Sequence, residues 1–175
     1  MAIAAICCRC AGAAQPTEYE LKAAFVYNFA KFVEWPEDAF VSPAESLRIG
    51  ILGNDPFGDA LPAVIAGRSA AGRGIELRRY RRPADVSGCQ ILFIRPPEGE
   101  LPRVLRALDP RGVLTVGEGE AFAREGGVIG LVMEENRVTF EVNLDAAERA
   151  HLTLSSKLLQ LARRVGRWPV DAEKS

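Results

Sequence analysis

The sequence predicts one α/β domain of a three-layer-like kind, with a mostly parallel sheet, flanking helices, and a C-terminal hairpin plus helix. Short apolar runs alternate with amphipathic segments, which is typical of parallel strands joined by crossover helices. Two further apolar runs flank Glu134-Glu135-Asn136, and this spacing predicts a hairpin. At 175 residues and 48% hydrophobic content, the chain is long enough to bury one continuous core without metal ions or many disulfides.

The first fourteen residues are set apart by composition. They are apolar, small and cysteine-rich, and they end in Ala11-Gly12-Ala13, a form that signal peptidases accept. The apolar run is short and Arg9 interrupts it, so we expect residues 1–14 to be an export signal truncated at its start. We expect the folded domain to span 15–166, and a polar tail to span 167–175. No later run approaches the roughly 20 apolar residues that span a bilayer, so we expect the exported, mature protein to be soluble.

The segment 17–36 predicts a helix with a strong apolar face. Thr17 and Glu20 have the spacing of a capping box. Pro36 disfavours helical geometry at Trp35, so we expect the helix to end before Pro36 and to leave Trp35 at its exit. The apolar residues of the predicted core face recur at three- and four-residue spacing: Leu21, Phe25, Phe29 and Phe32.

The rest of the chain repeats a strand-then-helix pattern. Asp55 is expected to cap a helix that begins at Pro56. The other expected elements are strands at 47–52, 74–80, 90–94, 113–116, 128–133 and 137–142, a helix at 101–108 and a helical turn at 120–124. Ser155 or Ser156 is expected to cap a last helix that carries Leu158, Leu159, Leu161, Ala162 and Val165. The tail from Gly166 is polar, and we expect it to be frayed.

Charge and residue content argue against several classes of function. The 22 basic and 23 acidic residues nearly cancel, so no long-range field would gather nucleic acid. His151 is the only histidine, and no nucleophile motif or metal-spaced pair accompanies it. We interpret Glu98, Glu100, Glu118 and Glu120 as solvated loop carboxylates. We therefore expect a protein that is not an enzyme and that uses no cofactor and no metal.

Two local patterns have simple structural explanations. Cys89 is the only cysteine outside the export signal, so we expect no disulfide in the mature domain and a small buried side chain at a strand start, with a reactive thiol as the alternative. Gly117-Glu118-Gly119 superficially matches a dinucleotide-binding loop, but Phe122 stands at the third glycine position. The carboxylate of Glu118 would also repel a pyrophosphate, so we do not expect a nucleotide site.

Four residues border the apolar face of the first helix and are candidates for a partner surface. Tyr27, Asn28, Lys31 and Trp35 bring amphipathic or hydrogen-bonding groups to these borders, and such groups are enriched at protein interfaces.

A second candidate set lies near the end of the domain. Glu141 and Asn143 are polar residues at the end of an apolar strand. With Ser155, Ser156 and Lys157 they could line a ligand or partner surface at the top of the last helix. Helix capping and strand ending explain these residues equally well.

One stretch of the chain is locally basic. It contains a single acid, Glu76, and six arginines: Arg68, Arg73, Arg78, Arg79, Arg81 and Arg82. A solvated sheet edge explains them, and the alternative is a patch for an anion or an acidic partner.

Several motifs recur in order from about Tyr19 to Val165. They are LKAAFVYNFAKFVEWP, LRIGILGNDPFG, CQILFI, LTVGEGEAFAREGGVIGLV, VTFEVNL and LSSKLLQLA. In these motifs the chain resembles the YfiR family of periplasmic regulators. The resemblance implies a homodimeric, non-enzymatic inhibitor that binds the periplasmic sensor domain of a membrane-bound diguanylate cyclase. An outer-membrane lipoprotein would then capture the inhibitor, and cyclic di-GMP and biofilm formation would rise.

The resemblance leaves one alternative function and contains one departure. The alternative is a periplasmic small-ligand-binding sensor domain that works with another membrane receptor. The departure is Gly50, which stands where the family commonly has a cysteine able to pair with the one at Cys89. That bridge cannot form in this chain.

Overall fold

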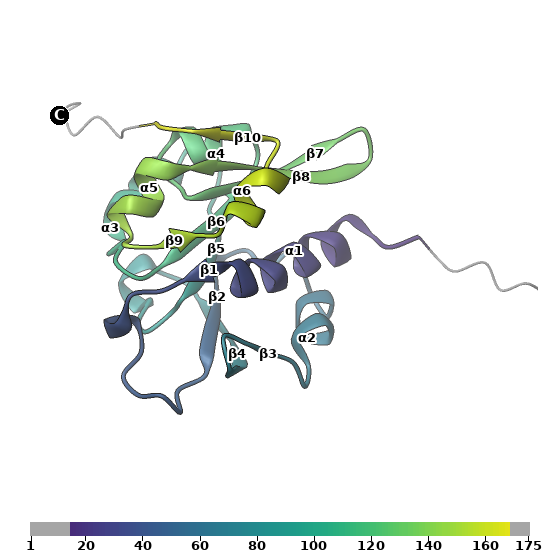
Figure 1. The fold of residues 1–175 in the computed structure, drawn as a ribbon. Coiled ribbons are helices and arrows are strands. Elements are labelled where there is room, and N and C mark those ends of the chain that lie inside the picture. The colour runs from purple at the N-terminus through teal and green to yellow at the C-terminus, as the bar shows by residue number, and fades with distance from the viewer. Residues whose placement is uncertain (1–14, 169–175) are drawn as a thin grey trace, which may run out of the picture.

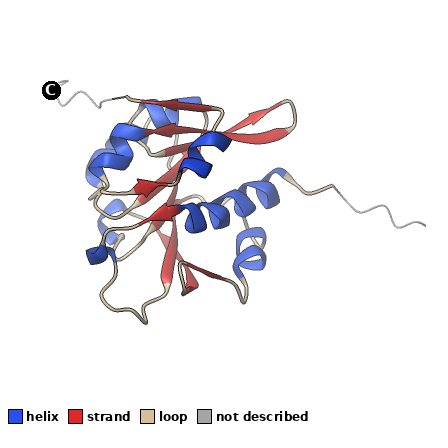
Figure 2. Ribbon diagram, in the orientation of Figure 1, coloured by secondary structure: helices blue, strands red, loops and turns tan. Residues whose placement is uncertain are grey.

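The computed structural model describes residues 15–168. The predicted export signal, 1–14, and residues 169–175 of the predicted tail lie outside the described residues. A curled sheet forms the middle layer, and helices cover both of its faces (Figures 1 and 2). The predicted fold class, a mostly parallel sheet with flanking helices and a C-terminal hairpin plus helix, is confirmed.

The main sheet has eight strands in the order β10-β8-β7-β6-β5-β2-β4-β3. Neighbouring strands are parallel except in the pairs β7–β8 and β3–β4. The strands are β2 Leu47–Gly53, β3 Ser69–Ala70, β4 Arg73–Tyr80, β5 Ile91–Arg95, β6 Leu114–Glu118, β7 Ile129–Glu134, β8 Arg137–Asn143 and β10 Arg164–Gly166. β4 and β5 flank β2, so the order reverses beside β2.

Helices are divided between the two faces of the sheet. They are α1 Glu18–Phe32, α2 Ala60–Ile65, α3 Leu101–Ala107, α4 Glu120–Arg124, α5 Leu144–Arg149 and α6 Ser156–Leu161, with short 3-10 turns at Glu37–Ala39 and Pro83–Asp85. Figure 1 shows α1 lying across the front face, with α2 and α6 beside it and the β7–β8 hairpin projecting past them. α3 and α4 cover the rear face.

Alternation along β5 produces two separate cores. Ile91 and Phe93 pack in the core shared with α1, whereas Leu92 and Ile94 pack with α3 and with Phe122 of α4. These four residues are each at most 2% exposed. A strand that is buried on both faces typically has a continuous apolar sequence, and CQILFI has such a sequence.

Phe122 explains one glycine within β6 and another after α4. A Cβ on Gly117 would lie 2.1 Å from the Phe122 ring, and one on Gly127 would lie 2.0 Å from it. Gly126 has a φ of 109°, so it supplies the turn, while Gly127 makes room for the ring. The GEGEAF and GG motifs thus build a slot for a phenyl ring.

The first helix agrees with its prediction, and the second does not. α1 has the predicted Thr17 and Glu20 capping box and ends before Pro36, at Phe32; Val33–Glu34 then forms the strand β1, which pairs with β9, Thr153–Leu154. The prediction that a helix begins at Pro56 is wrong, since α2 starts at Ala60. Asp55 Oδ1 instead accepts a hydrogen bond from the Phe57 amide at 2.8 Å, which closes a local turn.

Besides β9, the C-terminal region contains α5 and β10, which the apolar pattern did not indicate. α5 follows β8 directly and is capped by Asn143, whose Oδ1 accepts from the Ala146 amide at 3.2 Å. α6 is capped by Ser155 as predicted but ends at Leu161. Val165 therefore lies outside the helix, in β10, whose three residues pair in parallel with Glu141, Val142 and Asn143 of β8.

Candidate functional site

Tyr27 on α1 is buried between two cations. Tyr27 is 7% exposed, and Lys31 Nζ lies 4.3 Å from the centroid of the Tyr27 ring. The Arg68 guanidinium lies 5.0 Å from the same ring, and the Tyr27 hydroxyl donates to the Ser69 carbonyl at 3.4 Å. Tyr27 therefore supports two exposed cations more than it offers a contact surface of its own.

The end of α1 and the start of α6 are joined side by side. β1 pairs with β9, and the Ser155 amide donates to the Phe32 carbonyl at 3.0 Å. Lys157 Nζ lies 5.3 Å from the Phe32 ring centroid. We call the resulting surface the α1–α6 surface; its members are Asn28, Lys31, Ser155, Ser156 and Lys157.

The charges of the α1–α6 surface are free within the described part of the chain. Lys31 and Lys157 are exposed, and neither forms an ion pair with any residue of 15–168. The Ser155 hydroxyl is occupied, since it caps α6 by accepting from the Leu158 amide at 3.2 Å. Two uncompensated ammonium groups on one surface favour an acidic partner.

Trp35 is bound into the domain. Its Nε1 donates to the Gln90 carbonyl at 3.0 Å, and its ring meets Phe40 edge-on with centroids 6.5 Å apart. The residue is half-buried against the core under α1. Its replacement by alanine would remove both packing and a hydrogen bond, so the lysines test the α1–α6 surface more cleanly.

Glu141 and Asn143 do not line the same surface as Ser155, Ser156 and Lys157. Phe140 and Val142 of β8 face α1, so the intervening Glu141 and Asn143 face the opposite side, beneath α4. Both residues are 0% exposed. Asn143 is fully used as a cap for α5 and as a donor to the Ala123 carbonyl at 2.7 Å.

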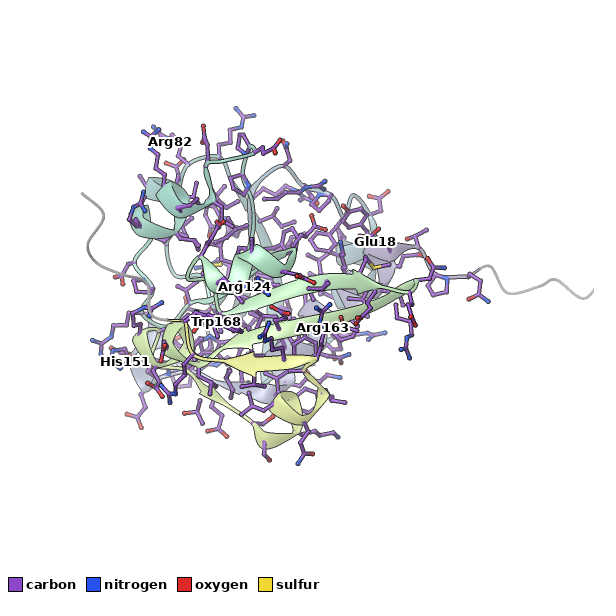
Figure 3. All side chains as sticks on the ribbon, turned by 90° about the horizontal axis from the view of Figure 1, so that it is seen from above. Glu18, Arg82, Arg124, His151, Arg163 and Trp168 are labelled. Carbon is purple, nitrogen blue, oxygen red and sulfur yellow. The ribbon has the colours of Figure 1, made fainter. Side chains whose placement is uncertain are left out.

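Glu141 is a buried carboxylate that lacks a hydrogen bond within the described structure. Its nearest basic group is Arg163, with Nη2 3.6 Å from Oε1. Arg163 also contacts Glu120 at 2.8 Å and Glu134 at 3.7 Å. Figure 3 shows Arg163 over the sheet, with Arg124, another partner of Glu120, beside it. This cluster ties the segment before β10 to β7, β8 and α4.

A second charged cluster lies at the start of α1, and sequence reasoning missed it. Lys22 is 3% exposed and contacts the carboxylates of both Glu18 and Glu118. Arg95 Nε lies 3.4 Å from Glu118 Oε2, and Arg95 Nη1 donates to the Tyr19 hydroxyl at 3.1 Å. The interpretation of Glu118 as a solvated carboxylate is therefore wrong. A lysine on the apolar side of a helix was the available signal.

Burial and ion pairing act in opposite directions on Lys22. Burial disfavours the charged ammonium, but the hydrogen bonds to Glu118 and Glu18 outweigh that effect and raise the pKa of Lys22. The ammonium thus stays charged inside the fold and fixes the first turn of α1 to the end of β6.

A cavity of about 330 Å³ opens beside this cluster, at the carboxyl ends of β5 and β6. Its walls are Ile94, Arg95, the loop Pro96–Gly99, Leu101, Pro102, Glu118, Phe122 and Glu125. In parallel sheets ligands bind at this edge, outside the carboxyl ends of the strands.

The arginines near β4 do not converge on one site. Arg79 pairs with Asp55 at 2.7 Å, and Arg82 pairs with Asp85 at 2.7 Å. Arg78 lies 3.4 Å from Glu76, and Arg73 donates to three backbone carbonyls in the loop before β2. Within residues 15–168 only Arg68 and Arg81 of the six have a side chain without an ion pair or hydrogen bond, which favours a solvated edge over an anion patch.

Cys89 is buried as predicted, and His151 lies in an exposed loop. Cys89 is 3% exposed, and burial raises the pKa of its thiol to about 12, so it is a buried, unreactive side chain. His151 is exposed after α5, at a φ of 55°, and Figure 3 places it at the far end of the molecule from Glu18. A Cβ on Gly50 would lie 2.7 Å from Cys89 Sγ. Gly50, in β2, and Cys89, just before β5, are therefore neighbours in space.

Two kinds of feature are absent from the described residues. Residues 15–168 contain no group of three or more histidine, cysteine, aspartate or glutamate side chains arranged to hold a metal ion. No helix in the same range combines the length and apolarity needed to cross a membrane.

Comparisons with known proteins support the sequence resemblance. A family model described as DUF4154, YfiR/HmsC-like, matches residues 19–163. Among solved structures, an ABC domain in complex with L-Trp from Streptococcus pneumonia aligns with a TM-score of 0.50 and 12% identity, covering 69% of this chain and 55% of that chain. A conserved domain protein from Vibrio cholerae O1 biovar El Tor strain N16961 aligns with a TM-score of 0.50 and 13% identity, covering 68% and 54%. This chain thus matches about half of either structure, and at such identities the likeness shows the fold alone.

Proposed function

The chain belongs to the YfiR/HmsC-like family, and from that membership we propose that it is a periplasmic regulator that works by binding rather than catalysis. Its target is the periplasmic sensor domain of an inner-membrane diguanylate cyclase, which it inhibits as a homodimer. Cyclic di-GMP and biofilm formation rise when an outer-membrane lipoprotein captures it. A binding equilibrium that favours one state of the cyclase is sufficient for such control.

Family membership supports this proposal, and the α1–α6 surface is where we place the contact with the partner. Two segments far apart in the sequence, one ending at Phe32 and one beginning at Ser155, are joined by β1–β9 pairing. Their junction presents Lys31 and Lys157, each stacked on an aromatic ring of α1. The rings restrict the two ammonium groups, so less side-chain entropy is lost when a partner binds.

The chemistry of the partner follows from these charges. Lys31 and Lys157 have no carboxylate partner within residues 15–168, and Arg68 lies over the same Tyr27 ring as Lys31. The exposed apolar side chain of Leu161, 62% exposed, extends the surface along α6. A sensor domain that carries acidic residues around a small apolar contact would fit it.

Reversal of the two charges tests the proposal. We expect Lys31→Glu/Lys157→Glu to weaken binding to the cyclase sensor domain by tenfold or more, because attraction becomes repulsion at the contact. The measurement is titration of the purified sensor domain by calorimetry at two salt concentrations. The matched control is Arg81→Glu/Arg106→Glu, which reverses two exposed arginines outside this surface.

Two results would contradict the proposal. One is that the control pair weakens binding as much as the lysine pair, which would leave only net charge as the cause. The other is that the tagged mature protein never retains a membrane diguanylate cyclase from envelope extracts.

A further inference from the structure

We propose that the cavity at the carboxyl ends of β5 and β6 binds a small organic cation with an apolar body. The cavity has a volume of about 330 Å³, which is within the usual range for small-molecule sites. This site does not involve the α1–α6 surface, and the proposal does not depend on the identity of the protein partner.

The position of the cavity is the first argument. β5 and β6 are parallel and end side by side, with Phe93 paired to Val116 in the register. β5 also lies next to β2, beside which the strand order reverses, and the loop after β5 supplies Pro96, Pro97 and Gly99 to the cavity wall. Loops that diverge at such an edge leave a crevice between them, and ligands of parallel sheets bind there.

The charge of the walls is the second argument. The residues that line the cavity include one guanidinium, Arg95, and three carboxylates: Glu98, Glu118 and Glu125. Arg95 is already engaged with Glu118 at 3.4 Å and with the Tyr19 hydroxyl at 3.1 Å. Among residues 15–168, Glu98 and Glu125 form no ion pair. The negative charge left over selects a cation and repels an anion.

The remaining wall determines the rest of the ligand. It is made of apolar side chains from the end of β5, the following loop, α3 and α4: Ile94, Pro96, Pro97, Leu101, Pro102 and Phe122. Proline rings and the packed Phe122 are rigid, so the apolar floor is formed before a ligand arrives. A bare metal ion would make no favourable contact with these apolar side chains. An amine attached to a hydrocarbon or aromatic group would contact both the carboxylates and the apolar side chains.

Phenethylamine is the probe for this site, with two matched compounds as controls. 2-Phenylethanol keeps the ring and removes the charge, and 3-phenylpropionate keeps the ring and reverses the charge. We expect calorimetry on the mature protein to show saturable binding of phenethylamine, about tenfold weaker binding of the alcohol, and no binding of the acid.

The variants assign the binding to the cavity. Glu98→Gln/Glu125→Gln should reduce the affinity for phenethylamine by about tenfold or more. Glu37→Gln/Glu135→Gln, which removes two exposed carboxylates elsewhere, should leave it unchanged. Equal melting temperatures of the two double variants would show that the fold is retained in both.

Four outcomes would overturn the proposal. They are a linear, non-saturating response to phenethylamine, equal affinity for the acid and the amine, wild-type affinity in Glu98→Gln/Glu125→Gln, and an equal loss in the control variant. None of them bears on binding to the cyclase sensor domain, so this site and the proposed function are tested separately.

Discussion

Among single residues, one buried charge and two glycines constrain the packing of the domain. Lys22 keeps its charge while 3% exposed because Glu18 and Glu118 both contact it. Gly117 and Gly127 are required because Phe122 fills the space where their side chains would be. Both features lie next to the proposed ligand cavity, whose walls include Glu118 and Phe122.

We predict that Lys22→Met lowers the free energy of unfolding by about 1–3 kcal/mol at pH 7, because two charged hydrogen bonds are lost while Arg95 still compensates Glu118. The raised pKa of Lys22 determines the pH dependence. The contribution is complete below the ordinary lysine pKa of 10.5 and is lost as the pH rises through the higher pKa of the folded state. Urea unfolding between pH 7 and 11 measures the difference between wild type and variant.

The control is Lys31→Met, which removes an exposed lysine from the same helix. A Lys22→Met variant no less stable than this control would show that the pair contributes no net stability.

We predict that Gly127→Ala destabilises the domain by at least about 2 kcal/mol, because the new methyl group would lie 2.0 Å from the Phe122 ring. The combination with Phe122→Leu should recover part of the loss. Gly74→Ala is the matched control, since its nearest neighbour would be 3.6 Å away. Thermal unfolding compares them, and equal melting temperatures for Gly127→Ala and Gly74→Ala would contradict the slot.

Among helices and strands, apolar periodicity correctly predicts the long helix and the main strands. It fails for short elements that form because of a few tertiary contacts. The motif CQILFI gave a buried strand because both faces of β5 are covered. The sequence pattern does not indicate α5, because its buried residues are small alanines with no strong apolar repeat. Its cap, Asn143, is instead one of the predicted site residues. β10 was assigned to a helix because its pairing with β8 is a tertiary contact that local sequence does not encode.

The sequence predicts single residues of the candidate site but not how they are grouped, because the grouping depends on tertiary contacts. Border positions of the first helix identified Asn28 and Lys31, and capping identified Ser155, but only the β1–β9 pairing shows that they share a surface. Glu141 and Asn143 alternate with core residues, so they point beneath α4 instead. Lys22 and Glu118 are 96 residues apart, and no spacing rule connects them.

We predict that Arg163→Met loosens β10 and lowers stability by about 2 kcal/mol or more, because Glu141 then remains buried without a counter-charge. Arg163→Met/Glu141→Leu should recover most of that loss, since it removes the uncompensated charge as well. Hydrogen exchange at the amides of 164–166 reports the strand directly, and urea unfolding reports the energy. Equal stability of the single and double variants would contradict the assigned role of Arg163.

In the molecule as a whole, α1 runs from the proposed ligand cavity to the α1–α6 surface. Its first turn is bound to the end of β6 beside the ligand cavity, and its last turn forms half of the α1–α6 surface. Arg167 and Trp168 continue the fold past β10, with Arg167 paired to Asp145 and Glu148 and the Trp168 carbonyl bonded to Asn143. These contacts fix the chain beyond β10 to α5 and β8, and none of the described residues is arranged as a metal centre.

Regulation by binding is tested by the rate of cyclic di-GMP synthesis by the purified full-length cyclase as the mature protein is titrated in. We expect the rate to fall in a saturable way and to reach its limit near one copy of this protein per cyclase protomer. The Lys31→Glu/Lys157→Glu variant should leave the rate close to that of the cyclase alone. An unchanged rate at saturating protein, or equal inhibition by the charge-reversed variant, would contradict these expectations.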